Sequence, residues 1–181
     1  MKNLNDIATA YFFLDANKDT EGKRTFRKTS AGIFVPSCIE MGHSFFAKFG
    51  LSRYKKFLDI GSGDGRIVRT ASLFTDSTGI EADKTMFDES ERIGPIPGCK
   101  PFRFIHGDYM DPFFFFHEFD FIYWFPDKDG EEVEEKLLWQ MTGVLAIKSR
   151  IYVPKKLKKI EEDEENNFYI YSNPNNLKRV A

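Results

Sequence analysis

The chain has 181 residues, a formal net charge of −2, two cysteines and three histidines. This length favours one domain, and a content of 41% hydrophobic and 30% charged residues is typical of a soluble globular protein. The near-neutral charge argues against a general electrostatic surface for nucleic acid. Cys38 and Cys99 fit neither a disulfide framework nor a metal-ligand spacing, so we expect no metal site and a reducing, cytoplasmic location. We also expect no transmembrane segment, because no apolar run reaches 18 residues.

The first 50 residues predict a helical extension and a basic loop packed on the core, ahead of the main domain at 51–181. Residues 5–15 read as a short amphipathic helix capped by Asp6. Residues 16–30 are polar and basic, which indicates a loop of solvated charge, or else a flap that contacts a partner. A second helix follows, with the capping box Ser37 and Glu40 at its start.

From residue 56 onward, short apolar strands alternate with helices. Helices are expected at 67–74, 84–92 and 130–141, and strands at 56–60, 77–81, 102–106, 119–124, 144–148 and 168–172. This alternation predicts an α/β fold with a Rossmann-like, doubly wound, mostly parallel sheet and helices on both faces. The charged stretch 155–165 is interpreted as a solvated connection. In such a fold, ligands bind at the carboxyl ends of the strands.

The sharpest motif is Asp59-Ile60-Gly61-Ser62-Gly63-Asp64-Gly65, which follows a strand and opens a helix. Its glycines allow the backbone to approach a ligand closely. Three further acidic positions, Asp64, Glu81 and Asp108, should converge with Asp59 on one rim of the sheet. Such a cluster would repel a pyrophosphate and attract a cationic ligand, which favours S-adenosylmethionine over a dinucleotide.

The motifs at 59–65, Gly79-Ile80-Glu81 and Gly107-Asp108 resemble those of the class I S-adenosylmethionine-dependent methyltransferases, over roughly residues 34–172. The resemblance implies that Asp59 lies near the methionine amino group and that Glu81 binds both ribose hydroxyls. Asp108 would accept from the adenine amino group, with the backbone of Tyr109 beside the ring. The glycines of the predicted cofactor loop are Gly61, Gly63 and Gly65.

Several of these acids have another interpretation. Asp59 could tie down the loop backbone, and Asp64 is better interpreted as a loop hydrogen-bonding residue or helix cap. Asp83 resembles a helix N-cap more than a second ribose ligand. Asp111 competes with Asp108, although it could also be a turn former before Pro112.

A narrower resemblance is to the small lysine methyltransferases of the ATP-synthase c-subunit and adenine-nucleotide translocase, and to their microbial relatives. It is carried by Phe34-Val35-Pro36-Ser37, the glycine loop through Val68, and Phe121-Ile122-Tyr123-Trp124-Phe125-Pro126. It implies N-methylation of a protein lysine. The predicted catalytic residues are Trp124, Phe125 and Pro126, with the aromatic faces attracting an ammonium group.

Other functions stay open at this point. The acceptor could be RNA, which the charge does not favour, or a small molecule, and the chain could be a non-catalytic cofactor-binding interaction module. Tyr123 and one of the two following rings could simply be buried. Asp127 could orient the acceptor amine, or cap the next helix. The run Phe113–Phe116 could be a buried connection or an exposed apolar patch.

Overall fold

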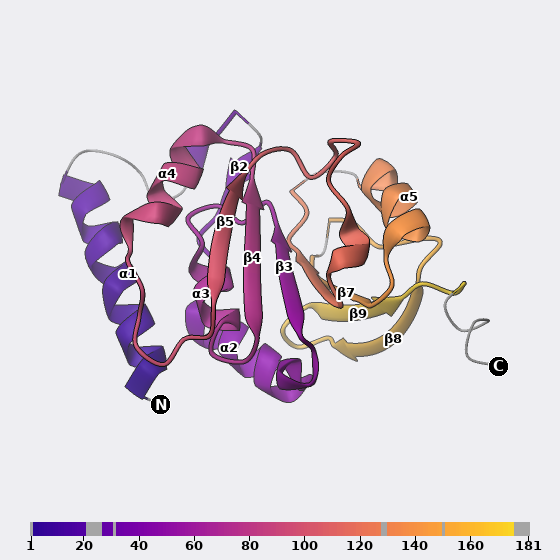
Figure 1. Ribbon diagram of the computed structural model, residues 1–181, viewed down its shortest axis with the longest axis horizontal. Helices are drawn as coiled ribbons and strands as arrows, with labels where there is room; N and C mark the ends of the chain where they lie inside the picture. The colour runs from indigo at the N-terminus through magenta and orange to yellow at the C-terminus, as the bar shows by residue number, and fades with distance from the viewer. Residues whose placement is uncertain (1, 21–26, 31, 128–129, 150, 176–181) are drawn as a thin grey trace.

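The computed structural model describes residues 2–20, 27–30, 32–127, 130–149 and 151–175, and its centre is a seven-stranded sheet (Figure 1). The strand order is β5-β4-β3-β6-β7-β9-β8, with the first five strands parallel and β9 antiparallel to both of its neighbours. The strands are β3 (Lys56–Ile60), β4 (Asp76–Glu81), β5 (Phe102–His106), β6 (Phe121–Trp124), β7 (Val144–Lys148), β8 (Lys158–Asp163) and β9 (Phe168–Ser172). The predicted Rossmann-like fold class is therefore confirmed.

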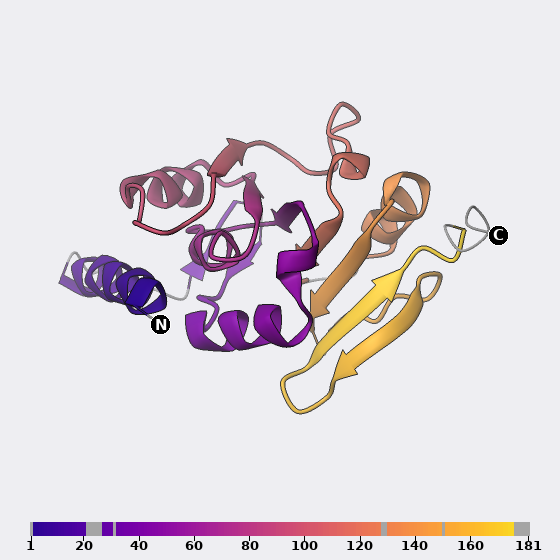
Figure 2. The ribbon, with the colours of Figure 1, turned by 60° about the horizontal axis from the view of Figure 1, so that its bottom comes forward.

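Five described helices surround the sheet, and a two-stranded hairpin lies beside it (Figure 2). The helices are α1 (Lys2–Thr20), α2 (Ile39–Lys48), α3 (Arg66–Ala71), α4 (Lys84–Arg92) and α5 (Glu131–Gln140). The hairpin pairs β1 (Arg27–Lys28) with β2 (Ile33–Phe34). Short 3₁₀ turns occur at Leu51–Arg53 and Phe116–Glu118. No helix of the described residues is long and apolar enough to cross a membrane.

Alternation along the strands divides the core between the two faces of the sheet. Leu58 of β3 packs in the cluster that contains Leu137 of α5, whereas its neighbour Phe57 packs with Phe46 of α2. The second face is rich in phenylalanine, which accounts for much of the unusual aromatic content. Its buried rings are Phe45, Phe46, Phe49, Phe57, Phe121 and Phe168. Edge-to-face and stacked ring contacts fix these side chains and with them the strands that carry the site.

The N-terminal helix is longer than predicted. It begins at Lys2, so Asp6 lies inside it and is not its cap, and it extends to Thr20 rather than ending near residue 15. The apolar face is as expected, with Ile7, Tyr11 and Leu14 buried. Lys18 was expected to be solvated, yet its side chain is only 3% exposed. The basic residues at 21–26 lie outside the described residues.

Two other local predictions were wrong. The helix α2 begins at Ile39 with Cys38 as a cap that makes no side-chain bond, and Ser37 instead hydrogen-bonds the buried Tyr123 side chain. The charged stretch 155–165 is largely strand β8, which forms the edge of the sheet against β9. Edge strands tolerate charge on both faces, and periodicity therefore did not reveal this one.

Candidate active site

The glycine loop adopts a backbone that only glycine takes without strain. Gly61, Gly63 and Gly65 have φ angles of +73°, +56° and +79°. The amides of Gly61 and Ser62 both donate to the carbonyl of Ile80, which fixes the loop to the end of β4. A Cβ at Gly61 would meet no atom within 4 Å although this residue lines the pocket, so the missing side chain leaves space there for a ligand.

Glu81 lies at the end of β4 and is 7% exposed. One carboxylate oxygen accepts from the amide of Gly63 and the other from the amide of Asp83, each at 2.8 Å. Burial raises the pKa of Glu81, while these two amides oppose the shift. A carboxylate has about four acceptor positions, so Glu81 joins the loop to β4 and can also bind a hydroxyl group.

Asp59, at the end of β3, is 4% exposed and lines the same pocket. Among the described residues its carboxylate has no hydrogen bond or ion pair. Burial raises its pKa well above the ordinary value, and the charges of Glu81 and Asp64 raise it further. A buried carboxylate without a cation, facing a cavity, fits an ammonium group of a ligand.

Asp64 belongs to the loop, but its charge is already compensated. Its carboxylate is fully buried and lies 2.6 Å from the Arg66 guanidinium and 3.6 Å from Lys18 Nζ. Its backbone carbonyl accepts from the hydroxyl of Tyr11, also on α1, at 2.8 Å. Asp64 is thus a structural hydrogen-bonding residue of the loop, one of the two roles that the sequence suggested for it.

The pocket extends from the glycine loop to the end of β6 and encloses about 320 Å³. Its apolar wall combines Phe34 and Val35 with all three predicted catalytic residues, Trp124, Phe125 and Pro126. Trp124 is only 4% exposed and packs against Tyr152, so it belongs to the core as much as to the pocket. Phe125 is 37% exposed and is the more accessible ring.

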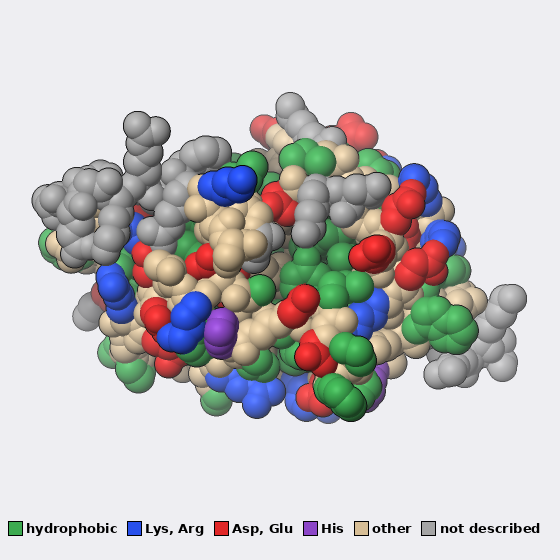
Figure 3. Space-filling view, turned by 90° about the horizontal axis from the view of Figure 1, so that it is seen from above, with side chains coloured by type: hydrophobic (Ala, Val, Ile, Leu, Met, Phe, Trp, Pro, Cys, Tyr) green, Lys and Arg blue, Asp and Glu red, His purple; other side chains and the backbone are tan. Residues whose placement is uncertain are grey.

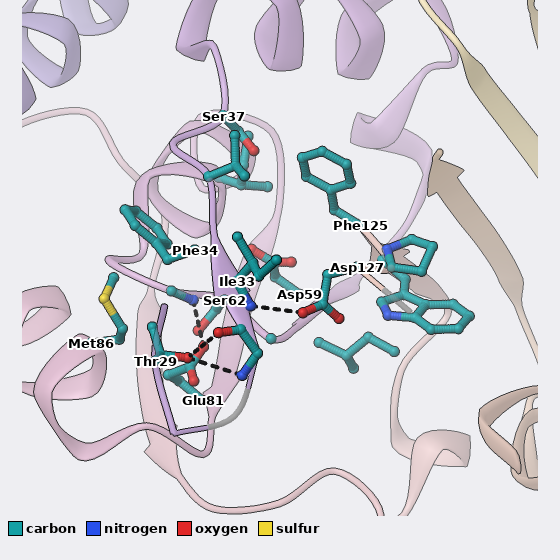
Figure 4. A pocket seen from close by; sticks show the side chains of 18 of the residues that line it. Thr29, Ile33, Phe34, Ser37, Asp59, Ser62, Glu81, Met86, Phe125 and Asp127 are labelled. Carbon is teal, nitrogen blue, oxygen red and sulfur yellow. Dashed lines mark hydrogen bonds between the residues drawn. The ribbon is translucent and has the colours of Figure 1, made fainter. Parts of the chain in front are cut away.

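The hairpin β1–β2 forms another wall and is held by two carboxylates. Asp127 accepts from the amide of Ile33 at 2.8 Å (Figure 4). Asp83 accepts from both the amide and the hydroxyl of Ser30, at 2.8 and 2.7 Å. Asp83 also caps α4 through the amide of Met86, as predicted. The expectation that Asp127 caps the next helix was wrong, because α5 begins at Glu131 after Gly130.

The structure brings together eight of the ten predicted site residues and leaves two outside the pocket lining. Those in the lining are Asp59, Gly61, Gly63, Glu81, Tyr109, Trp124, Phe125 and Pro126. Gly65 instead caps α3, and a Cβ there would lie 2.5 Å from the Phe104 ring. Asp108 is exposed, and its carboxylate accepts from the amide of Met110 at 2.7 Å.

Burial, together with the charges of Asp108, Asp127 and Glu81, raises the pKa of Tyr109 to about 12, which keeps its hydroxyl neutral. The lining also contains Met86 and Ile151, which sequence reasoning missed. Ile151 lies three residues after the end of β7, and an apolar residue beyond the end of a parallel strand was the available signal. Figure 3 shows the molecule from above the view of Figure 1, and hydrophobic side chains gather near the centre of that face with acidic side chains beside them.

No protein-family model and no curated protein matches the sequence. Solved structures do match the fold. An RNA methyltransferase from Salinibacter ruber in complex with S-adenosyl-L-homocysteine matches with a TM-score of 0.53 and 18% identity, over 76% of this chain and 91% of that chain. A TehB-like SAM-dependent methyltransferase from Corynebacterium glutamicum matches with a TM-score of 0.51 and 17% identity, over 90% and 95%. The chain has the Rossmann-like methyltransferase fold.

This chain spans only about half the length of some solved structures that it matches. The YcgJ protein from Bacillus subtilis has a TM-score of 0.49 and 19% identity, over 60% of this chain, and the match spans 50% of its own chain. At these identities the likeness concerns the fold, and the activity has to be argued from the site.

Proposed function

We propose that the protein is an S-adenosylmethionine-dependent methyltransferase that N-methylates a protein lysine. The observation that carries the proposal is Asp59, a buried carboxylate with no cation partner in the described part of the chain. It faces a cavity with the bare backbone of Gly61 on one side and aromatic rings on another. When bound, S-adenosylmethionine supplies a methyl group already activated by its sulfonium. The protein's own task is then binding and alignment.

The cofactor end of the pocket has an acceptor for the ammonium group and for the ribose hydroxyls of such a ligand. Asp59 would pair with the methionine ammonium, and Glu81 would accept from the ribose hydroxyls at its free acceptor positions. Gly61 would allow the ligand to lie against the loop backbone, whereas the Phe34 ring already covers the backbone of Gly63. Tyr109 would lie at the adenine end. These assignments fit the fold family and the resemblance of the motifs.

The acceptor end is apolar, which suits a lysine that must arrive as a neutral amine. Phe125 and Trp124 exclude water there, and desolvation lowers the pKa of a lysine that enters. The described residues that line the pocket include no histidine or cysteine, and alignment of the amine with the methyl group requires neither. The lysine ammonium gives up its proton to solvent before transfer, and attack of the neutral amine on the methyl group would leave a methylammonium product and S-adenosylhomocysteine.

An RNA acceptor is the main alternative, and one structural neighbour is an RNA methyltransferase. The sequence would support it if the basic residues of 18–28 gathered over the pocket. Lys18 does not, because it is buried in ion pairs with Glu89, Asp64 and Asp15. A small-molecule acceptor and a non-catalytic binding module are the further alternatives.

Two experiments test the proposal in order. Calorimetry should show binding of S-adenosylmethionine with a dissociation constant in about the low-millimolar range or tighter, and weaker binding of NAD. Incubation of the protein with cell lysate and methyl-labelled cofactor should then place label on protein, and acid hydrolysis should release it as methyllysine. Tight NAD binding without S-adenosylmethionine binding would refute the cofactor. Label on RNA or on a metabolite would refute the acceptor, and bound cofactor without any labelled product would indicate a binding module.

A further inference from the structure

Lys136, on α5, reaches across to the loop that follows β5. Its Nζ donates to the backbone carbonyl of Tyr109 at 2.7 Å and to that of Asp111 at 2.8 Å. Tyr109 lines the pocket, whereas Lys136 does not. A cation that binds two carbonyls of one loop fixes the orientation of those peptide planes, and here one of them carries a residue of the candidate site.

The phenylalanine run contributes to the same attachment. Lys136 Nζ lies 5.8 Å from the centre of the Phe114 ring and 5.1 Å from that of Phe116, within the range of cation–π attraction. Phe116 is fully buried, and its amide donates to the side chain of Gln140, one helical turn beyond Lys136, at 2.9 Å. The loop is therefore attached to α5 at two successive turns, and the two rings cover part of the ammonium.

Within the loop, side chains of the same segment form the turns. The carboxylate of Asp108 accepts from the amide of Met110, and that of Asp111 accepts from the amide of Phe113. Such Asx turns shape a loop but do not fix its place relative to the sheet. Lys136 and Gln140 supply that placement from a different element.

We propose that Lys136 is a positioning residue for the adenine end of the pocket: by holding the carbonyls of Tyr109 and Asp111, it sets the affinity and the base selectivity of nucleoside binding. This inference rests on the proposed function, since it assumes that the nucleoside lies beside Tyr109. It adds a residue that is distant in sequence from every cofactor motif. It also gives the phenylalanine run a role in the site.

The test uses S-adenosylhomocysteine as the ligand in calorimetry on the full chain. We expect Lys136→Met to weaken binding about tenfold, because two charge-assisted hydrogen bonds to the loop are lost. Lys136→Arg should bind within about threefold of the wild type, since a guanidinium can donate to both carbonyls and stack on the rings. Lys156→Met is the matched control. Lys156 is an exposed lysine that pairs with Glu135 of α5, the helix that carries Lys136, and its removal should leave binding unchanged.

A second ligand separates positioning from general loss of structure. S-inosylhomocysteine lacks the adenine amino group, and the ratio of the two affinities reports how precisely the loop is held against the base. We expect this ratio to fall in Lys136→Met and to be kept in Lys136→Arg. A general destabilisation of the protein would lower the affinity for both ligands equally and leave the ratio of the two affinities unchanged.

The outcomes are distinguishable. If the wild type binds no S-adenosylhomocysteine, the proposed function is wrong. If the wild type binds it and Lys136→Met binds with equal affinity and selectivity, the positioning role is wrong. Thermal melting establishes whether each variant is folded at the assay temperature. Should Lys136→Met be unfolded there, Lys136→Gln keeps one neutral donor and should show an intermediate loss, and unchanged binding by it would equally overturn the inference.

Discussion

We expect cofactor binding to depend most directly on Glu81. Its carboxylate holds the amides of Gly63 and Asp83 and would also accept from the ribose. We expect Glu81→Ala to weaken S-adenosylmethionine binding about tenfold to hundredfold, because charge-assisted hydrogen bonds of about 1.5–3 kcal/mol each are lost and solvent replaces part of them. Calorimetry measures the effect. Asp76→Ala, at the exposed opposite end of the same strand, is the control, and equal affinities in all three proteins would disprove the assignment.

Phe125 provides the cleaner test of the acceptor wall, because Trp124 is also a core residue. Phe125→Ala should lower methyl transfer while leaving cofactor affinity within about threefold, since only the acceptor side loses a ring. Steady-state kinetics with a labelled acceptor and calorimetry measure the two quantities. Phe115→Ala removes a similarly exposed ring outside the pocket lining and should change neither. Full activity of Phe125→Ala on every acceptor would exclude this wall from the site.

At the scale of elements, α1 is joined to the glycine loop and to α4 by Lys18. Its Nζ lies 2.9 Å from Glu89 and 3.6 Å from Asp64, all three side chains being buried. We expect Lys18→Met to lower the free energy of unfolding by about 3 kcal/mol, because two buried carboxylates lose this cation. Urea denaturation measures it, and Lys18→Met/Glu89→Gln should recover part of the loss.

The exposed pair Lys84–Asp88 on α4 supplies the control for Lys18. Lys84→Met should cost under about 1 kcal/mol, because both partners are solvated. An equally small cost for Lys18→Met would mean that the buried ion pairs do not hold α1 in place.

The strands around the cofactor motifs could be predicted because their signals are local. Hydrophobic runs followed by glycine or an acid identify β3 and β4, and the parallel topology then brings Asp59 and Glu81 to one rim. Contacts between distant segments could not be predicted. In the sequence alone Lys18 resembles a solvated lysine, and only the fold brings the glycine loop and α4 beside it. Asp127 likewise resembles a helix cap, and only the fold places Ile33 next to it. The edge strand β8 has no apolar face, so its sequence lacks the alternation of apolar and polar residues by which strands are recognised. Only its pairing with β9 identifies it.

For the molecule as a whole, the buried Asp59 should link stability to pH. Because its pKa is raised in the folded state, the folded protein holds this proton more tightly than the unfolded chain does. Stability therefore falls as pH rises from the unfolded carboxyl value of about 4 towards the raised pKa, by about 1.4 kcal/mol for each pKa unit between them.

Asp59→Asn removes this cost. We expect the variant to be more stable than the wild type at neutral pH, with the difference shrinking towards pH of about 4, as measured by urea denaturation. It should also bind S-adenosylmethionine more weakly, because the ionised carboxylate that would pair with the ammonium is gone. Asp76→Asn, an exposed change, should alter neither. Equal stability of Asp59→Asn and the wild type at every pH would show that Asp59 carries no such cost.

The two tryptophans of the chain lie in opposite surroundings. Trp124 is 4% exposed and lines the pocket, whereas Trp139, on α5, is 87% exposed. Their emission should therefore separate, with a blue-shifted contribution from the first and a red-shifted, iodide-quenchable one from the second. Replacement of Trp139 by phenylalanine leaves Trp124, in the wall of the pocket, as the single tryptophan, which can be excited selectively at long wavelength. Ligand entry can then be followed optically, in real time and without a label.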